Sequence, residues 1–290
     1  MKVLITGAAG RVGSVISSVL HEAGLELRLT DRRVRKNLPK KVEVMNLLDR
    51  DGVYRVVDEA DAVVHLGNHP YFSDNLEAQT VYGENCQMNM NVFTAARELG
   101  VKKVIFISSV QVINGDRKYY SDESRIQPSM LKYLPLDGDT PPNPRNPYSL
   151  SKRAGELLME HWVAPEGIES VTIRLPWTSH PDWWRWLKRK GMSTTIQDHS
   201  LLDECFTYLH AEDAARLVLA CLRTSLPGYR QYFPAARTPA TAIPIAELIQ
   251  RFYGNVPLRQ PVETLKSLVD IRRITEETGW APTYDLHESD

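Results

Sequence analysis

A tyrosine and a lysine stand four positions apart in the segment Tyr148-Ser149-Leu150-Ser151-Lys152. In a helix this spacing places both side chains on one face, about one turn apart. A tyrosine hydroxyl has a reference pKa near ~10, so it becomes a usable base near neutrality only where positive charge stabilises the phenolate. The Lys152 ammonium can supply that charge. The pair indicates proton transfer through Tyr148, although an amphipathic helix with a solvated lysine also fits the spacing alone.

Two consecutive serines, Ser108 and Ser109, follow the β-branched run Val104–Ile107. If that run is a strand of a parallel sheet, its carboxyl end lies at the edge where such sheets bind ligands. A hydroxyl at this edge can hold a substrate oxygen beside the tyrosine. The predicted catalytic residues are therefore Ser109, Tyr148 and Lys152.

The segment Thr6-Gly7-Ala8-Ala9-Gly10-Arg11-Val12-Gly13 follows a short apolar run and opens a helical pattern. A pyrophosphate needs backbone amides that point at it, close approach without β-carbons, and the positive end of a helix dipole. The three glycines supply these requirements. The plain structural alternative is a tight strand-to-helix turn. We predict a dinucleotide site whose contacts here are Gly7, Ala9, Gly10, Arg11 and Val12.

An acidic residue, Asp31, ends the next predicted strand. A carboxylate at this place can accept hydrogen bonds from the adenosine ribose hydroxyls, which favours NAD. Arg32 and Arg33 follow at once, and a guanidinium there can meet the 2′-phosphate of NADP, so NADP stays open as the alternative. Both Asp31 and Arg32 are predicted cofactor contacts.

Other candidate cofactor contacts lie where further predicted strands end, because a doubly wound sheet binds ligands at the carboxyl ends of its strands. Tyr148 and Lys152 are expected to contact the cofactor as well. The remaining members of this set are Asn46, Leu47, Leu66, Gly67, Asn68, Ile107, Ser108, Leu175 and Trp177.

All these residues need a scaffold that brings them to one edge. The first 175 residues alternate short β-branched runs with stretches of helical period, which is typical of an α/β fold with a doubly wound parallel Rossmann sheet. An apolar stripe from Val12 to Leu20 predicts a first helix that Gly24 ends. Further helices are expected at 85–99 and 148–162. The predicted strands are Val3–Ile5, Leu25–Leu29, Val42–Val44, Ala62–Leu66, Val104–Ile107 and Val171–Arg174.

A cluster of prolines between Pro135 and Pro147 predicts an irregular connection over the site. After Arg174 the pattern weakens, with helices expected near Ala211–Leu222 and Ile245–Tyr253. We predict a dinucleotide-binding domain over residues 1–175, to which residues near 205–235 return. A smaller substrate-binding lobe is predicted over most of 176–290.

The motifs in this order resemble the extended short-chain dehydrogenase/reductase family, in particular its NAD-dependent epimerase/dehydratase branch. TGAAGRVG is similar to the family's cofactor loop, VIFISS to its catalytic-serine strand, and NPYSLSKRAGE to its Tyr-Lys helix. The resemblance covers nearly the whole chain. It implies a bound nicotinamide cofactor, the catalytic set Ser109, Tyr148 and Lys152, and Asn85 as the asparagine that begins a helix beside the cofactor. It also implies a homodimer formed through the helices at 85–99 and 148–162.

Two segments depart from the family's pattern. Where the family reads SSxxVYG, this chain reads SSVQVING. Alignment on the strand keeps Ser109 as the catalytic hydroxyl, whereas alignment on Gly115 places Val110 there; the strand is preferred, because insertions belong in loops. The family's RxxNVYGP is replaced by RLPWTSHP, which argues against a nucleotide-sugar substrate.

Residues near the second departure and near the catalytic serine are candidates for contact with the substrate. The aromatic face of Trp177 can stack on a sugar or another ring. For Trp183, Trp184 and Trp186, a hydrophobic lid or a subunit contact fits as well as substrate stacking does. The predicted substrate contacts are Ser109, His69, Gln111, Trp177 and His180.

The chain has 290 residues and a formal net charge of -1, so no overall field draws it to nucleic acid or to an anionic membrane, and a small-molecule substrate is the expected partner. The first strand begins at Val3, which leaves no room for a signal peptide, and no segment is apolar for the ~18 residues of a membrane span. A cytoplasmic location is expected. Cys86, Cys205 and Cys221 predict neither a disulfide framework nor a zinc site, and no metal site is predicted.

These observations predict an NAD(P)-dependent oxidoreductase that acts on a secondary alcohol or carbonyl of a sugar or sugar-acid-like substrate. Its layout also resembles that of uronate dehydrogenases. The alternative is a nucleotide-sugar epimerase or dehydratase, which returns the hydride and keeps its NAD. A non-catalytic regulator that senses dinucleotide redox state is disfavoured by the Tyr148–Lys152 pair, and a serine hydrolase by the lack of a GxSxG motif.

Overall fold

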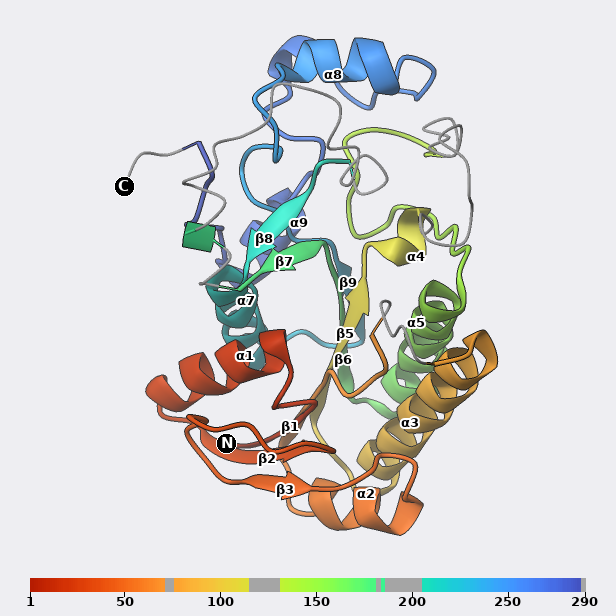
Figure 1. Ribbon diagram of the computed structural model, residues 1–290, viewed down its shortest axis with the longest axis vertical. Helices are drawn as coiled ribbons and strands as arrows, with labels where there is room; N and C mark the ends of the chain where they lie inside the picture. The colour runs from red at the N-terminus through yellow and green to blue at the C-terminus, as the bar shows by residue number, and fades with distance from the viewer. Residues whose placement is uncertain (71–75, 115–130, 181–183, 186–204, 288–290) are drawn as a thin grey trace.

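A parallel sheet forms the centre of the computed structural model, which describes residues 1–70, 76–114, 131–180, 184–185 and 205–287. Within these residues the sheet has seven strands in the order β3-β2-β1-β4-β5-β6-β9 (Figure 1). The order reverses beside β1, which creates the crevice at which doubly wound sheets bind ligands. The strands are β1 (Lys2–Thr6), β2 (Glu26–Asp31), β3 (Val42–Val44), β4 (Ala62–His65), β5 (Lys103–Ser109), β6 (Glu169–Leu175) and β9 (Tyr229–Tyr232).

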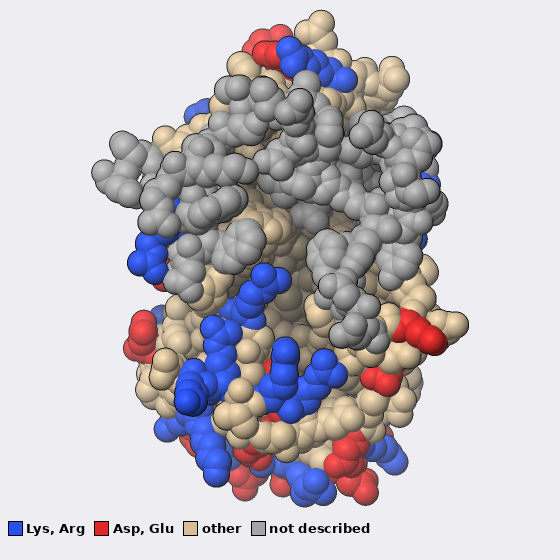
Figure 2. All heavy atoms as spheres, viewed as in Figure 1, with Lys and Arg blue, Asp and Glu red and all other residues tan. Residues whose placement is uncertain are grey.

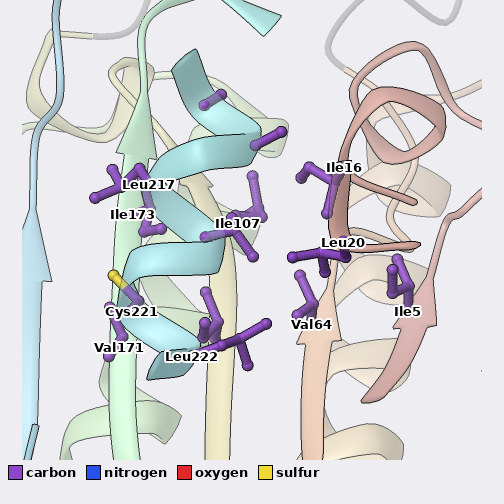
Figure 3. Packing of buried hydrophobic residues seen from close by; sticks show 14 of the residues in the cluster. Ile5, Ile16, Leu20, Val64, Ile107, Val171, Ile173, Leu217, Cys221 and Leu222 are labelled. Carbon is purple, nitrogen blue, oxygen red and sulfur yellow. The ribbon is translucent and has the colours of Figure 1, made fainter. Parts of the chain in front are cut away.

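Helices cover both faces of this sheet, which is why its central strands β1, β4, β5 and β6 are buried almost throughout. On one face α1 (Arg11–Glu22) and α7 (Ala211–Arg223) pack on Ile5 and Ile107, as Figure 3 shows. On the other face lie α2 (Arg50–Val57), α3 (Ala78–Glu98) and α5 (Pro147–Leu158), which Figure 1 shows with α3 and α5 side by side. None of the described helices has the length and apolar character that a membrane span requires.

A further apolar cluster, smaller than the one under α1 and α7, lies beyond the carboxyl edge of the sheet. It combines α8 (Ile245–Phe252) with Leu134 and Leu136 from the proline-rich connection. Bridges from Leu134 to Leu258 and from Leu136 to Val269 hold these segments together. The other elements are α4 (Gln111–Asn114), the parallel pair β7 (Trp177–Ser179) and β8 (Tyr208–His210), α9 (Arg272–Thr278), a π turn (Met159–Val163), and 3-10 turns at Ala164–Glu166 and Val262–Thr264.

The chain crosses between the two clusters more often than a division at residue 175 suggests. Residues 131–136 join the smaller cluster, whereas α7 and β9 return to the main sheet. Ile274 and Trp280, near the end of the chain, also pack in the large cluster. The smaller cluster is therefore assembled from segments on both sides of the Tyr-Lys helix.

The sequence predicted neither α2 nor β9. For the elements that it did predict, the bounds differ mainly at one helix. The helix expected at 85–99 begins at Ala78, because the polar residues of its first turns carry too little apolar periodicity to mark a face. β2 runs from Glu26 to Asp31, so Asp31 is its last residue. Gly24 has a positive φ of 80° after α1, as expected of a helix-terminating glycine.

A fully buried ion pair joins α5 to β6. Arg174 donates to both carboxylate oxygens of Glu156, with Nε–Oε1 and Nη2–Oε2 distances of 2.9 and 2.8 Å. Ser108 donates to the same carboxylate at 2.8 Å, and Arg174 also donates to the carbonyl of Thr140 at 2.7 Å. Because each charge is paired and hydrogen-bonded, the pair fixes the helix against two strands and the proline-rich connection.

Replacing Arg174 by methionine is expected to lower the free energy of unfolding by roughly 3–5 kcal/mol, because the Glu156 carboxylate would stay buried without its bidentate partner. Urea unfolding followed by circular dichroism measures this loss. The double variant Arg174→Met/Glu156→Leu removes both charges and should be more stable than Arg174→Met. If Arg174→Met unfolded at the wild-type urea concentration, the pair would contribute little.

Candidate functional site

A cavity of about 440 Å³ opens at the carboxyl edge of the sheet, between β1, β4, β5 and α5. Its wall also includes residues that were not predicted to contact a ligand, among them Pro70, Pro176, Thr178 and Ser179. The predicted site residues on this wall are Gly7, Gly10, Arg11, Val12, Leu66, Asn68, His69, Ile107, Ser108, Ser109, Gln111, Tyr148, Lys152, Leu175, Trp177 and His180.

The glycine loop is built by close backbone contacts. Gly7 has a positive φ of 69°, and a Cβ there would lie 2.9 Å from the backbone nitrogen of Gly67. A Cβ on Gly13 would lie 2.2 Å from the carbonyl oxygen of Gly7. The chain therefore turns sharply into α1, whose first-turn amides at Arg11 and Val12 have no partner within the helix. This open cradle with a positive helix end suits a pyrophosphate.

Asp31 lies beside the same loop. Its carboxylate accepts hydrogen bonds at 3.0 Å from the backbone nitrogens of Ala9 and Arg33, and each oxygen keeps a further lone pair for a ligand hydroxyl. Arg32 is exposed, whereas Arg35 reaches over the loop, with Nη1 at 3.4 Å from the carbonyls of Ala9 and Gly10. Arg35 escaped the sequence reasoning because no motif marks it.

Positive side chains gather on the face that carries this loop. Figure 2 shows Lys and Arg side chains clustered over the region of β1, β2 and α1, beside a hollow in the surface. A cluster of this kind attracts an anionic group such as a pyrophosphate.

Seven predicted cofactor contacts are not among the described residues that line the cavity: Ala9, Asp31 and Arg32, which lie at or beside the glycine loop, and Asn46, Leu47, Gly67 and Asn85. Asn46 is exposed, and its side chain accepts from the Leu48 amide. Leu47 is buried beneath the loop and would meet any side chain at Gly67. Asn85 bonds to both backbone groups of His69 and to Ser151 Oγ. Leu47, Gly67 and Asn85 thus support the cavity wall from behind.

The helix with Tyr148 and Lys152 begins where local chemistry favours a start. Asn146 and Ser149 form a capping box, and Pro147 occupies the first turn, where the missing N–H costs nothing. Farther along, a Cβ on Gly155 would lie 2.6 Å from the ring of Phe106, so this glycine lets α5 approach β5 closely. Both features place the helix against the serine strand.

Lys152 is buried, and its Nζ donates at 2.7 Å to two neutral oxygens, Asn68 Oδ1 and the carbonyl of Ile107. It also lies 4.8 Å from the ring centre of Phe106 and 5.7 Å from that of Tyr148. Burial lowers the pKa of Lys152 to about 7, and Glu156 partly opposes this shift. Near pH 7 the amine is therefore present in both its charged and its neutral form.

The two serines have different partners. Ser108 Oγ donates to buried Glu156, so its hydroxyl is committed to the protein interior. Ser109 Oγ accepts from the Gln111 amide at 3.2 Å, which leaves its own proton for an oxygen in the cavity. Val110, the rival in the alternative alignment, is an apolar residue of the small cluster. Ser109 therefore stays the proposed catalytic hydroxyl.

The far wall of the cavity carries the substrate candidates. The side-chain oxygen of Gln111 accepts from Asn146 Nδ2 at 3.1 Å. Trp177 is the first residue of β7, and His180 directly follows its last residue. The ring of His69 contacts Glu84, with Nε2 and Oε2 2.6 Å apart, so much of its hydrogen bonding is used within the protein.

Trp184 packs in the protein interior. Its ring centre lies 5.1 Å from that of His210 and 5.9 Å from that of Tyr284, in edge-to-face contacts. Trp183 and Trp186 lie outside the described residues. In the part of the chain that the structure describes, no group of three His, Cys, Asp or Glu side chains is arranged to hold a metal ion.

Comparisons with known proteins agree with this architecture. The chain is 33% identical over 179 residues to the uronate dehydrogenase of Pseudomonas syringae pv. tomato, an overlap of 60% of this chain but 58% of that protein. It is 31% identical over 214 residues to the NAD-dependent glucose-6-phosphate dehydrogenase of Haloferax volcanii, covering 70% of this chain and 79% of the relative. The chain thus spans under two thirds of the uronate dehydrogenase.

Solved structures share the whole fold. The Thermus thermophilus UDP-glucose 4-epimerase, determined with NAD, superposes with a TM-score of 0.64 at 20% sequence identity, covering 98% of this chain and 95% of that one. The family model that describes the NAD dependent epimerase/dehydratase family matches residues 3–179. That range includes the glycine loop, the serine strand and the Tyr-Lys helix, and this chain belongs to the NAD-dependent epimerase/dehydratase family.

Proposed function

We propose that this protein is an NAD-dependent oxidoreductase that interconverts a secondary alcohol and a carbonyl on a sugar or sugar-acid-like substrate. One observation carries the proposal: Ser109, Tyr148 and Lys152 line the same cavity as the glycine loop. A proton-transfer set and a dinucleotide cradle that share one cavity can act on the same carbon–oxygen bond.

The cofactor half of the site fits NAD. The loop offers first-turn amides at Arg11 and Val12, and Asp31 offers carboxylate oxygens for ribose hydroxyls. When bound, NAD would accept the hydride that leaves the substrate carbon. The guanidinium of Arg35 lies over the loop and could bind the extra phosphate of NADP, so NADP stays the second candidate.

The chain's own groups handle the proton. Ser109 Oγ accepts a hydrogen bond from the backbone amide of Gln111 and donates one to the substrate oxygen. This bond places the substrate hydroxyl beside Tyr148. Tyr148 takes the hydroxyl proton during oxidation and returns it during reduction. Lys152, when charged, lowers the energy of the phenolate form. Lys152 is held in place because Asn68 Oδ1 and the carbonyl of Ile107 each accept a hydrogen bond from its Nζ.

The substrate class is proposed from the cavity wall and from the relatives. Ser109, Gln111, Thr178 and His180 offer the mixed donors and acceptors that sugar hydroxyls need, and Trp177 offers a ring face. The names of the two curated relatives describe dehydrogenases of a uronate and of a sugar phosphate. Both support a net oxidation of a sugar derivative.

An epimerase or dehydratase is the second candidate, since the Thermus thermophilus structure is a UDP-glucose 4-epimerase. The segment after β6, where the chain reads RLPWTSHP, argues against it. A screen of sugars, uronic acids and nucleotide sugars with NAD and NADP separates the two. Accumulating reduced nicotinamide supports the dehydrogenase, whereas an epimerised product without net reduction supports the alternative.

A homodimer is proposed through α3 and α5. These neighbouring helices expose large apolar side chains, namely Tyr82 and Met90 on α3 and Leu150 and Leu157 on α5. Exposed apolar residues gathered on adjacent helices are typical of a protein interface.

A cytoplasmic location is also proposed. Cys205 and Cys221 are buried free thiols, which suits a reducing compartment.

Replacing Tyr148 by phenylalanine is expected to lower kcat by roughly 10²–10⁴-fold, because the phenol oxygen that exchanges the proton is gone while the ring remains. Steady-state kinetics with the substrate found in the screen measures the loss. Calorimetry should show NAD affinity unchanged. A variant with wild-type turnover would remove Tyr148 from the proposed role.

Replacing Gly13 by alanine is expected to weaken NAD binding at least roughly tenfold, or about 1.4 kcal/mol, because the new Cβ would collide with the Gly7 carbonyl and displace the loop. Isothermal titration calorimetry gives the affinity. Gly83→Ala is the matched control, since a Cβ at this helical position meets nothing within 4 Å. Equal affinities in the two variants would contradict the loop's assignment.

Replacing Met90 and Leu157 together by glutamate is expected to convert a dimer into monomers, because burying two carboxylates in the interface is costly. Size-exclusion chromatography with light scattering measures the mass. Val34→Glu, at an exposed site outside α3 and α5, is the control that should stay dimeric. A monomeric wild-type protein, or a double variant that remains a dimer, would refute this interface.

A further inference from the structure

A chain of hydrogen bonds runs behind the cavity from β1 to Lys152. Thr6 Oγ1 lies 2.7 Å from His65 Nδ1, and His65 Nε2 lies 2.9 Å from Asn89 Oδ1. Asn68 Nδ2 donates to the same Asn89 oxygen at 2.9 Å, and Asn68 Oδ1 accepts from Lys152 Nζ at 2.7 Å. Thr6, His65 and Asn89 are fully buried. This series of hydrogen bonds thus connects β1, β4, α3 and α5 through side chains alone.

The direction of each donor in this chain follows from its partners. Thr6 Oγ1 accepts from the amides of Leu66 and Gly67, so its own proton is left for His65 Nδ1. A neutral imidazole that accepts at Nδ1 carries its proton on Nε2 and donates it to Asn89. Burial and the charge of Lys152 lower the pKa of His65 to about 3, which keeps the ring neutral.

Apart from its bonds with His65 and with Asn68 itself, the Asn89 amide has only a weak anchor among the described residues. Its Nδ2 donates to the carbonyl of Ser151 at 3.5 Å, which is long for a hydrogen bond. The bond from His65 Nε2 is therefore the main restraint that turns Asn89 Oδ1 toward Asn68. With that oxygen in place, Asn68 presents its nitrogen to Asn89 and its own oxygen to Lys152.

We propose that His65 is a positioning residue which, through Asn89, holds the Asn68 amide with its oxygen toward Lys152 and so keeps the lysine in its ammonium form. The hydrogen-bond part of the inference stands on the geometry, whereas its effect on turnover rests on the proposed function. Without the His65 donor, Asn68 can rotate and turn its N–H groups toward Lys152. The ammonium would then lose one of two oxygen acceptors.

The surroundings of Lys152 make it sensitive to this loss. Within the described residues, the ionisable groups that face it are Tyr148 and Glu156 on its own helix and His65 on β4. Phe106 and Ile107 on β5 and Asn89 on α3 face it without titrating. Loss of an acceptor lowers the pKa of a cation, so activity that needs the ammonium would disappear at a lower pH.

Two substitutions of His65 separate the bond to Asn89 from the rest of the side chain. The His65→Asn side chain can still reach Thr6 but is too short to reach Asn89. The His65→Gln side chain can place an amide nitrogen where Nε2 stood and keeps that donor. Phe93→Leu is the packing control, because Phe93 contacts the His65 ring edge-to-face at 5.4 Å without a hydrogen bond.

The primary readout is the titration of Lys152, followed by NMR in the full-length protein with ¹³C-labelled lysine side chains. The Lys152→Arg variant identifies the signal. We expect His65→Asn to lower the pKa of Lys152 by about one unit, a size typical of losing a hydrogen bond to the charged form. His65→Gln and Phe93→Leu should titrate as the wild type does. The alkaline limb of kcat/KM should move in parallel.

Equal Lys152 titration in wild type and His65→Asn would overturn the inference, as would an equal shift in Phe93→Leu. If His65→Asn failed to fold, a wild-type titration in His65→Gln against a lowered one in His65→Leu would decide the same question. Failure of the proposed function looks different: the wild type would show no turnover with NAD, while the titrations would still report on Lys152.

Discussion

The site depends on the buried ammonium group of Lys152, which contacts no carboxylate among the residues that the structure describes. Removing a charge from water costs several kcal/mol, so the surroundings of Lys152 must supply oxygen acceptors at good distances. They come from the carbonyl of Ile107 at the end of β5 and from Asn68 after β4. The parallel sheet brings the carboxyl ends of both strands to one edge, which places these two oxygens around one lysine on α5.

A second buried charge lies one turn further along α5 and is handled in the opposite way. Glu156 is matched by Arg174 and Ser108, and Arg153 joins from the helix itself. The paired carboxylate anchors the helix to β5 and β6, whereas the incompletely compensated lysine keeps a pKa near neutrality. On the same helix, the Glu156 carboxylate thus holds the structure together, whereas the Lys152 amine is available for chemistry.

Much of the fold could be predicted from local pattern. Most strands of the sheet contain short apolar runs, although β9 does not and was not predicted. Gly24 ends α1 with the positive φ that its position suggested. The start of α3 at Ala78 could not be predicted, because its first turns are polar and gain their stability from packing against α5. The smaller cluster could not be predicted either, because Leu134 and Leu136 pair with residues more than a hundred positions away in the sequence.

The sequence by itself determined the chemistry: which residue carries a phenol, which an ammonium, and which glycines admit a phosphate, because residue type and short-range spacing fix these properties. Tertiary structure decided which candidates share the cavity. It turned Ser109 toward the cavity and Ser108 toward Glu156, placed Asn85 behind the wall, and brought Arg35 over the loop. It also joined His65 to Lys152, since hydrogen bonds between distant strands and helices depend on packing that no local pattern encodes.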